Sequence, residues 1–154
     1  MENKIIKPNE KISHEVVEQF EVIIGKKLPD DYKALLLDSN GGEPQNDYFE
    51  IAKNNSRVRY FYGITNKGNI YNLIYERKLR LDRVPNDVLP IGTDYFGNCI
   101  CLSLRSETYG QIFFWDHELE SSDGEPATFK NLFLVAKSFG AFFKSLKKFD
   151  ASKI

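Results

Sequence analysis

Two short helix patterns near the N-terminus, each closed by glycine, limit the folds open to this chain. Ser13 is a suitable N-cap, and apolar residues then recur at helical spacing up to Gly25, where a left-handed conformation ends a helix. A second pattern begins at Leu28-Pro29 and ends at Asn40-Gly41-Gly42. The sequence therefore predicts two short helices joined at residues 25–28, as a helical hairpin or elbow.

The middle of the chain indicates β-strands. Residues 57–62 begin with alternating basic and apolar residues, as a half-buried strand does. Residues 98–104 and 111–115 predict an antiparallel pair around a turn at 106–110. The topology of residues 44–84 stays open at this point. Helices followed by mixed strands and helices favour an α+β fold, as a single domain with a mostly antiparallel sheet flanked by helices.

Two further helices are predicted. Residues 69–81 suit a helix capped by Asn69, with apolar side chains inward and basic ones outward. The expected inward residues are Ile70, Leu73, Ile74 and Leu81, and the expected outward ones are Arg77, Lys78 and Arg80. Ser138 is a suitable cap for a closing helix with an apolar stripe of phenylalanines.

Length and composition agree with one soluble domain. The chain has 154 residues, of which 42% are hydrophobic and 28% charged, and this is enough for a substantial core. Residues 1–12 are polar and predict an N-terminal arm, which leaves 13–150 as the domain. No apolar run has the length of a signal peptide or approaches the ~20 residues of a membrane helix, so we expect a cytoplasmic protein.

Net charge argues against direct binding of nucleic acid. The 21 Lys and Arg residues are balanced by 22 Asp and Glu residues, which leaves a net charge of −1 and no overall attraction to phosphate or membrane. Arg57 and Arg59, interleaved with Tyr60 and Tyr62, suit a base-stacking strand. Arginines that protect an edge strand from aggregation are the more common alternative.

The sequence offers no convincing catalytic or metal-binding set. Cys99 and Cys101 share one face of a predicted strand, and His14 and His117 are the only histidines, without the spacing of a zinc site. Buried structural cysteines are the expected outcome. There is no G-x-S-x-G nucleophile motif and no phosphate-binding loop. We therefore predict no catalytic residues, no metal site and no cofactor.

An acidic segment follows the last predicted strand. Residues 116–125 contain five acids and no Lys or Arg; the acids are Asp116, Glu118, Glu120, Asp123 and Glu125. Asp116-His117-Glu118 has the residue types for acid–base chemistry or metal binding. Neighbours in a strand point to opposite faces, however, so we expect Asp116 and Glu118 to converge while His117 points away. A solvated loop is the alternative.

Four short segments stand in a fixed order along residues 13–147. They are Leu28-Pro29-Asp30-Asp31-Tyr32-Lys33 with Asn40-Gly41-Gly42; Asp94-Tyr95-Phe96-Gly97-Asn98 with Cys99-Ile100-Cys101-Leu102; Gln111-Ile112-Phe113-Phe114-Trp115-Asp116-His117-Glu118; and Ser138-Phe139 with Phe142-Phe143. In this order they resemble the patterns "LP..Y...L...NGG", "D..GN..C", "G.VY.WDHE" and "SF..FL" of the SMI1/KNR4, or SUKH, superfamily. Phe113-Phe114 replaces the usual Val-Tyr, and Gly140 stands where a helix-favouring residue is commoner.

This resemblance implies a single α+β domain without catalytic activity. Bacterial members typically act as immunity proteins, which bind a polymorphic toxin, often a nuclease, and block it inside the producing cell. Fungal members are instead regulatory scaffolds in cell-wall signalling, and this is the alternative function. The expected partner is thus a protein toxin domain, and we expect a monomer or a weak homodimer.

The residues permit a physical version of this role. A nuclease is positive where it meets phosphate, so an acidic inhibitor surface complements it, and a few aromatic side chains hold the complex. The five acids of residues 116–125 supply the charge. Tyr95, Phe96 and Trp115 are candidate anchors, with Asp94 and Asn98 as a polar rim. The alternatives are that Trp115 is a sheet-core residue and that residues 94–98 are simply a turn.

Overall fold

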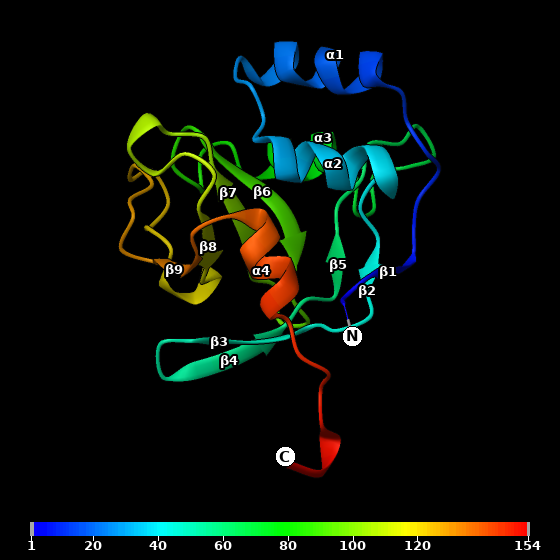
Figure 1. Cartoon of the computed structure of the whole chain (residues 1–154). Coiled ribbons are helices and arrows are strands. Elements are labelled where there is room, and N and C mark those ends of the chain that lie inside the picture. Colours follow the sequence, from blue (N-terminus) through cyan, green and yellow to red (C-terminus); the bar gives the residue numbers. More distant parts are fainter. Residues whose placement is uncertain (1, 154) are drawn as a thin grey trace.

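An antiparallel sheet of five strands forms the centre of the computed structural model, which describes residues 2–153 (Figure 1). The strands are, in spatial order, β5 (Tyr60–Phe61), β6 (Val88–Thr93), β7 (Cys99–Ser103), β8 (Ile112–Trp115) and β9 (Leu132–Ala136). Every neighbouring pair is antiparallel. The predicted α+β class and the hairpin of residues 98–115 are confirmed.

The helical elbow and the closing helix are also confirmed. The helices are α1 (His14–Ile24), α2 (Asp30–Asp38), α3 (Leu73–Leu79) and α4 (Phe139–Ser145). Ser13 Oγ accepts the Val16 N–H at the start of α1, and Gly25, at φ +72°, ends it. Figure 1 shows α1 above α2, and α4 lying across one face of the sheet next to α2.

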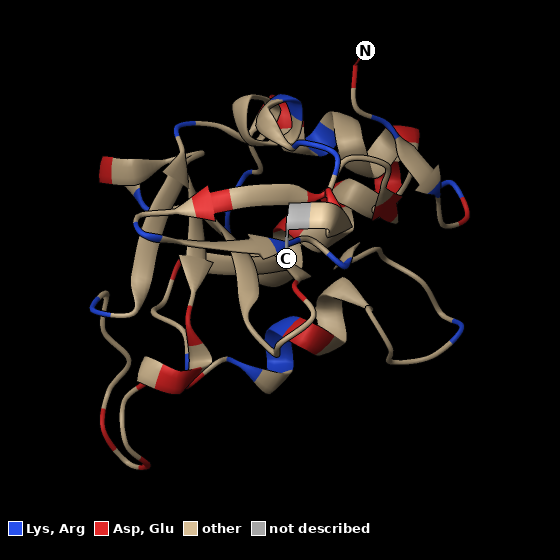
Figure 2. Cartoon of the chain, turned by 90° about the horizontal axis from the view of Figure 1, so that it is seen from below, with Lys and Arg blue, Asp and Glu red and all other residues tan. Residues whose placement is uncertain are grey.

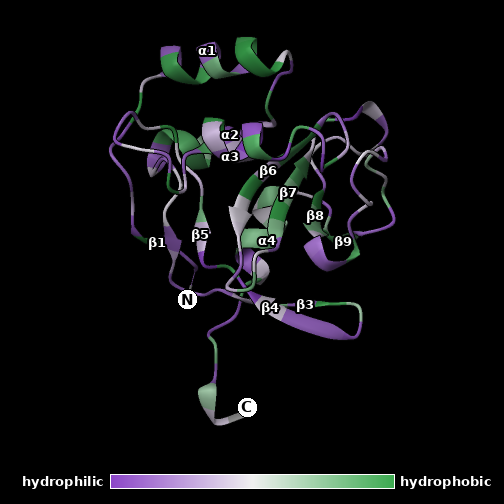
Figure 3. Cartoon of the chain, turned by 180° about the vertical axis from the view of Figure 1, so that it is seen from behind, coloured by the Kyte–Doolittle hydropathy of each residue, from purple (hydrophilic) through white to green (hydrophobic). Residues whose placement is uncertain are grey.

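Alternating side chains divide the core between the two faces of the sheet. On the face toward α2 and α4, Ile100 and Phe114 join a large cluster that includes Phe61 and Phe142. The opposite face carries a smaller cluster, made of Val84, Val88, Cys99, Cys101, Phe113, Trp115 and Leu132. Figure 3 shows β7 and β8 as mostly hydrophobic (green) and β4, in the hairpin below them, as mostly hydrophilic (purple).

The helix predicted over residues 69–81 is shorter and is rotated differently. Its cap is Asn72 rather than Asn69, because the Asn72 carboxamide oxygen accepts the N–H groups of Ile74 and Tyr75. Ile70, expected inside, is 82% exposed. Arg80, expected outside, is mostly buried and forms an ion pair with Glu76 at 2.7 Å. The predicted inward position of Leu81 is likewise wrong, since its side chain is exposed.

The open region 44–84 contains one of the two small sheets, and the other lies just before it. A hairpin of β3 (Tyr48–Ile51) and β4 (Asn54–Arg57) crosses the end of the main sheet, and Figure 1 shows it below β9 and α4. The strand predicted over residues 57–62 is therefore divided between β4 and β5. The expected N-terminal arm carries β1 (Ile5–Lys7), which pairs with β2 (Glu43–Pro44), so this segment lies along the domain.

Candidate functional site

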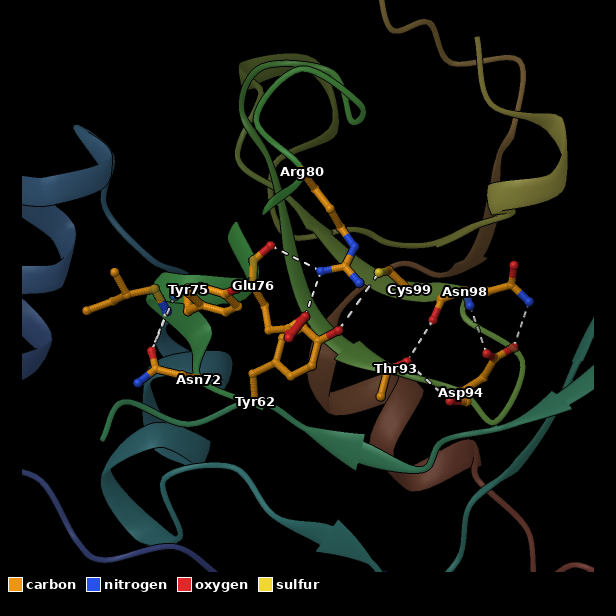
Figure 4. A network of polar contacts seen from close by, with 10 residues as sticks. Tyr62, Asn72, Tyr75, Glu76, Arg80, Thr93, Asp94, Asn98 and Cys99 are labelled. Carbon is orange, nitrogen blue, oxygen red and sulfur yellow. Dashed lines mark hydrogen bonds and ion pairs between the residues drawn. The ribbon is translucent and has the colours of Figure 1, made fainter. Parts of the chain in front are cut away.

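A tightly bonded turn connects β6 to β7 and contains four of the predicted site residues. Asp94, only 2% exposed, uses Oδ1 to accept the backbone N–H groups of Phe96 and Asn98 at 2.8 and 2.9 Å. Its Oδ2 accepts Asn98 Nδ2 and, from the β3–β4 hairpin, Ser56 Oγ, both at 2.9 Å. Figure 4 shows Asn98 beside the Asp94 carboxylate. Asp94 is therefore an internal support of the turn rather than an exposed polar rim.

A second turn follows β8 and is joined to the first. Asp116 Oδ1 accepts the Glu118 N–H at 3.0 Å and so caps a short 3-10 helix, His117–Leu119. The His117 N–H donates to Asn98 Oδ1 at 3.1 Å, and His117 Nε2–H donates to the Phe96 carbonyl oxygen at 2.9 Å. The prediction that His117 points away is wrong, because β8 ends at Trp115 and strand alternation stops there.

Gly97 allows the close approach of these two turns. It has φ +88°, which favours glycine, and a Cβ atom built there would lie 3.3 Å from His117 Nε2. The two turns therefore form one hydrogen-bonded unit, residues 94–98 with 116–119, which we call the paired turns.

A groove of about 390 Å³ lies between the paired turns and the β3–β4 hairpin. Ile51, Phe114 and Phe133 provide apolar lining from three different strands. Phe96 and Leu119, which are 72% and 50% exposed, also line it, together with the acidic residues Asp116 and Glu118. The hairpin's contribution could not be read from the sequence, since it depends on contacts between distant segments.

The two candidate aromatic residues beside Phe96 have different surroundings. The Tyr95 ring is exposed and contacts guanidinium groups, with Arg57 Cζ at 5.1 Å and Arg59 Cζ at 5.4 Å from its centroid. Trp115 is fully buried, in the smaller core cluster. Its proposed role as an exposed anchor is therefore wrong, and the alternative of a sheet-core residue is correct.

The five acids do not form one continuous patch. Glu120 is paired with Arg83 through two hydrogen bonds of 3.0 Å, and the Arg83 guanidinium also lies over the Trp115 ring. Glu120, Asp123 and Glu125 border a separate open depression against residues 81–86, on the Trp115 side of the sheet. Asp116 and Glu118 instead belong to the groove on the Phe114 side. Figure 2 shows Lys and Arg distributed among the acids over the molecule.

Both cysteines are buried and free, as expected; Cys99 contacts a buried polar network, and Cys101 lies in the smaller core cluster. Burial raises the pKa of Cys99 to about 11, so its thiol is protonated at neutral pH. Its Sγ is 3.9 Å from the Tyr62 hydroxyl, near the Arg80–Glu76 ion pair (Figure 4). Within residues 2–153, no three His, Cys, Asp or Glu side chains are grouped to hold a metal ion. None of the helices in this range is long and apolar enough to span a membrane.

Comparison with known proteins agrees with the segments noted in the sequence. The model of the SMI1 / KNR4 family (SUKH-1) matches residues 11–145. The chain is also 30% identical, over 158 aligned positions, to the SPbeta prophage-derived uncharacterized protein YokK of Bacillus subtilis (strain 168). That alignment covers 87% of this chain and 74% of the relative.

Proposed function

The chain belongs to the SMI1/KNR4 family (SUKH-1), and from this premise we propose that it is an immunity protein. In this role it binds a cognate toxin domain inside the producing cell and blocks it, without catalysis of its own. The toxin class that suits it best is a nuclease, because the active face of a nuclease is positively charged.

The observation that carries this proposal is the rigid presentation of exposed side chains by the paired turns. Phe96 and Leu119 are exposed apolar residues, and they stand beside the carboxylates of Asp116 and Glu118. The backbone beneath them is fixed by Asp94, Asn98 and His117. A surface fixed before binding loses little conformational entropy when a partner docks, and this favours high affinity.

Charge gives such a surface a second advantage. Acidic groups at the margin increase the rate of encounter with a basic partner, while buried apolar anchors slow dissociation. Phe96 is the best-placed anchor, since its side chain is 72% exposed although its backbone is held by Asp94.

Rescue of a poisoned cell tests the proposal. Affinity capture with the tagged chain from its native host identifies candidate toxins, and each candidate domain is then expressed with and without this chain. We expect the chain to restore growth and to inhibit the purified toxin at a 1:1 ratio. A captured toxin that kills equally well in its presence would overturn the immunity role.

Two variants locate the interface. The double variant Phe96→Ala/Glu118→Lys should lose rescue while it unfolds at the same temperature as the parent, because both side chains are exposed. Ile70→Ala is the matched control, since Ile70 is another exposed apolar residue and lies outside the groove. Full rescue by the double variant would place the interface elsewhere.

A further inference from the structure

We infer that the groove between the paired turns and the β3–β4 hairpin receives an arginine side chain of the toxin, next to an apolar residue of the same segment. This inference rests on the proposed function and specifies the chemistry of its contact. Under this inference, Asp116 and Glu118 contact the arginine, and the acids of residues 120–125 do not.

Charge complementarity is the first argument. Neither Asp116 nor Glu118 forms an ion pair with any Lys or Arg within residues 2–153, and no Lys or Arg lines the groove. Glu120, by contrast, is already neutralised by Arg83. The groove is thus a hollow where two carboxylates lack a cation, and an incoming guanidinium supplies one.

The shape and lining of the groove supply the second argument. Its volume of about 390 Å³ lies at the small end of the range of roughly 300–1,000 Å³ for small-molecule pockets, which leaves room for one arginine side chain and part of a neighbouring residue. The apolar lining from Phe114 and Phe133 suits the aliphatic stem of an arginine, and its planar head suits the carboxylates at the margin. Phe96 offers a ring on which the guanidinium can stack.

The same features oppose other occupants. A metal ion needs more ligands than the two carboxylates offer, and no group of three metal-binding side chains exists within the described residues. A phosphate or nucleic acid would meet two uncompensated negative charges. A purely apolar segment would leave both carboxylates beside it without a counter-charge.

NMR titration with short peptides tests the inference on the protein alone. The probe is acetyl-Gly-Arg-Leu-amide, and its controls replace arginine with lysine or with neutral, isosteric citrulline. We expect saturable amide shifts concentrated at Asn55, Phe96 and Glu118, with a Kd on the order of 1 mM. Citrulline should weaken binding at least about fivefold, and lysine about two- to threefold, because lysine lacks the planar fork.

Variants of the carboxylates complete the design. Glu118→Gln and Asp116→Asn should each weaken binding about three- to tenfold; asparagine retains an oxygen that can cap the Glu118 N–H. Asp123→Asn, on the separate loop, should leave the Kd unchanged. Three outcomes would each overturn the inference. The citrulline or lysine peptide could bind as tightly as the arginine peptide, the amide shifts could be spread equally over all the acidic surface segments, or no amide shift could saturate.

The peptide result and the rescue result are independent of each other. Rescue without peptide binding would mean that the toxin docks elsewhere, and the arginine groove would be rejected while the immunity role stands. Peptide binding without rescue would leave the groove as a cation-binding site and would reject the immunity role.

Discussion

Replacing Asp94 with alanine should destabilise the whole domain rather than only weaken the binding of a partner. The carboxylate is almost fully buried and accepts four hydrogen bonds, two from backbone N–H groups and two from side chains. In Asp94→Ala, the backbone N–H groups of Phe96 and Asn98 lose their acceptor. The hydrogen bond from Ser56 Oγ, which joins the β3–β4 hairpin to this turn, is lost as well. The residue predicted as part of a polar rim is therefore buried and supports the turn.

The expected magnitude follows from these four bonds. A hydrogen bond to a charged group contributes about 1.5–3 kcal/mol, but bonds that share one carboxylate are not additive, and water can reach part of the relaxed turn. We therefore expect a loss of about 3–5 kcal/mol from a free energy of unfolding of roughly 5–15 kcal/mol. For a domain of this size, a loss of about 4 kcal/mol lowers Tm by about 8–16 °C.

Urea unfolding followed by the fluorescence of Trp115 measures this loss. Trp115 is the only tryptophan and is fully buried, so its emission reports global unfolding. Ser56→Ala removes one of the four donors and should cost about 1 kcal/mol. Asp123→Asn, on an exposed loop, should change stability by less than about 0.5 kcal/mol. A loss below about 1 kcal/mol in Asp94→Ala would refute the structural role.

Three further predictions use the same unfolding assay. Asn40→Ala should lower the free energy of unfolding by about 3–5 kcal/mol. The buried carboxamide donates to the carbonyl oxygens of Glu10 and Ile64 and accepts the Ile64 N–H, and the backbone of Asn40 has φ +54°, which alanine adopts less readily. A loss below about 1 kcal/mol would contradict this. Ala52→Gly should stabilise the chain by about 0.5–1 kcal/mol, because Ala52 has φ +49° in the hairpin turn, and a loss of stability would show that this backbone is unstrained. Stability should fall as the pH rises from about 9 toward 11, since burial raises the pKa of the Cys99 thiol from its ordinary value near 9 to about 11, and the unfolded chain releases the proton first. Burial also raises the pKa of Cys101, so Cys99→Ala should make this fall shallower without abolishing it, and an unchanged slope would refute the assignment.

Local signals explain which parts of the fold the sequence predicted. The caps Ser13 and Ser138 each act within three residues of their own position, and the left-handed Gly25 ends α1 without help from distant segments. The hairpin of β7 and β8 follows from apolar runs on both sides of a short turn. Each of these features depends on neighbours in the chain, and neighbours are what a sequence displays directly.

Contacts between distant segments, together with one local interruption of a helix, explain what the sequence did not predict. Arg80 turns inward because Glu76 and the buried network around Tyr62 receive it, and helical periodicity alone favoured an exposed position. The α3 cap moves from Asn69 to Asn72 because Tyr71 takes φ +55° and interrupts the helix before Asn72. The Ser56 partner of Asp94 lies 38 positions away. Patterns of single residues contain no information about such pairings.

The end of β8 decides what each candidate site residue does. Because alternation continues up to Trp115, Phe114 lines the groove and Trp115 is buried on the opposite face. Beyond that point the Asp116 cap redirects the chain, and His117 turns toward Phe96.

This arrangement separates support from recognition within the same short segments. In the "D..GN" pattern the fixed positions are Asp94, Gly97 and Asn98, and these hold the backbone. The two open positions are Tyr95 and Phe96, and both side chains are exposed. At the interface proposed above, a partner would contact residues that the fold does not need, so this surface can change its chemistry without loss of the turn beneath it. Under the proposed immunity role, this property would allow one scaffold to follow a toxin whose surface changes.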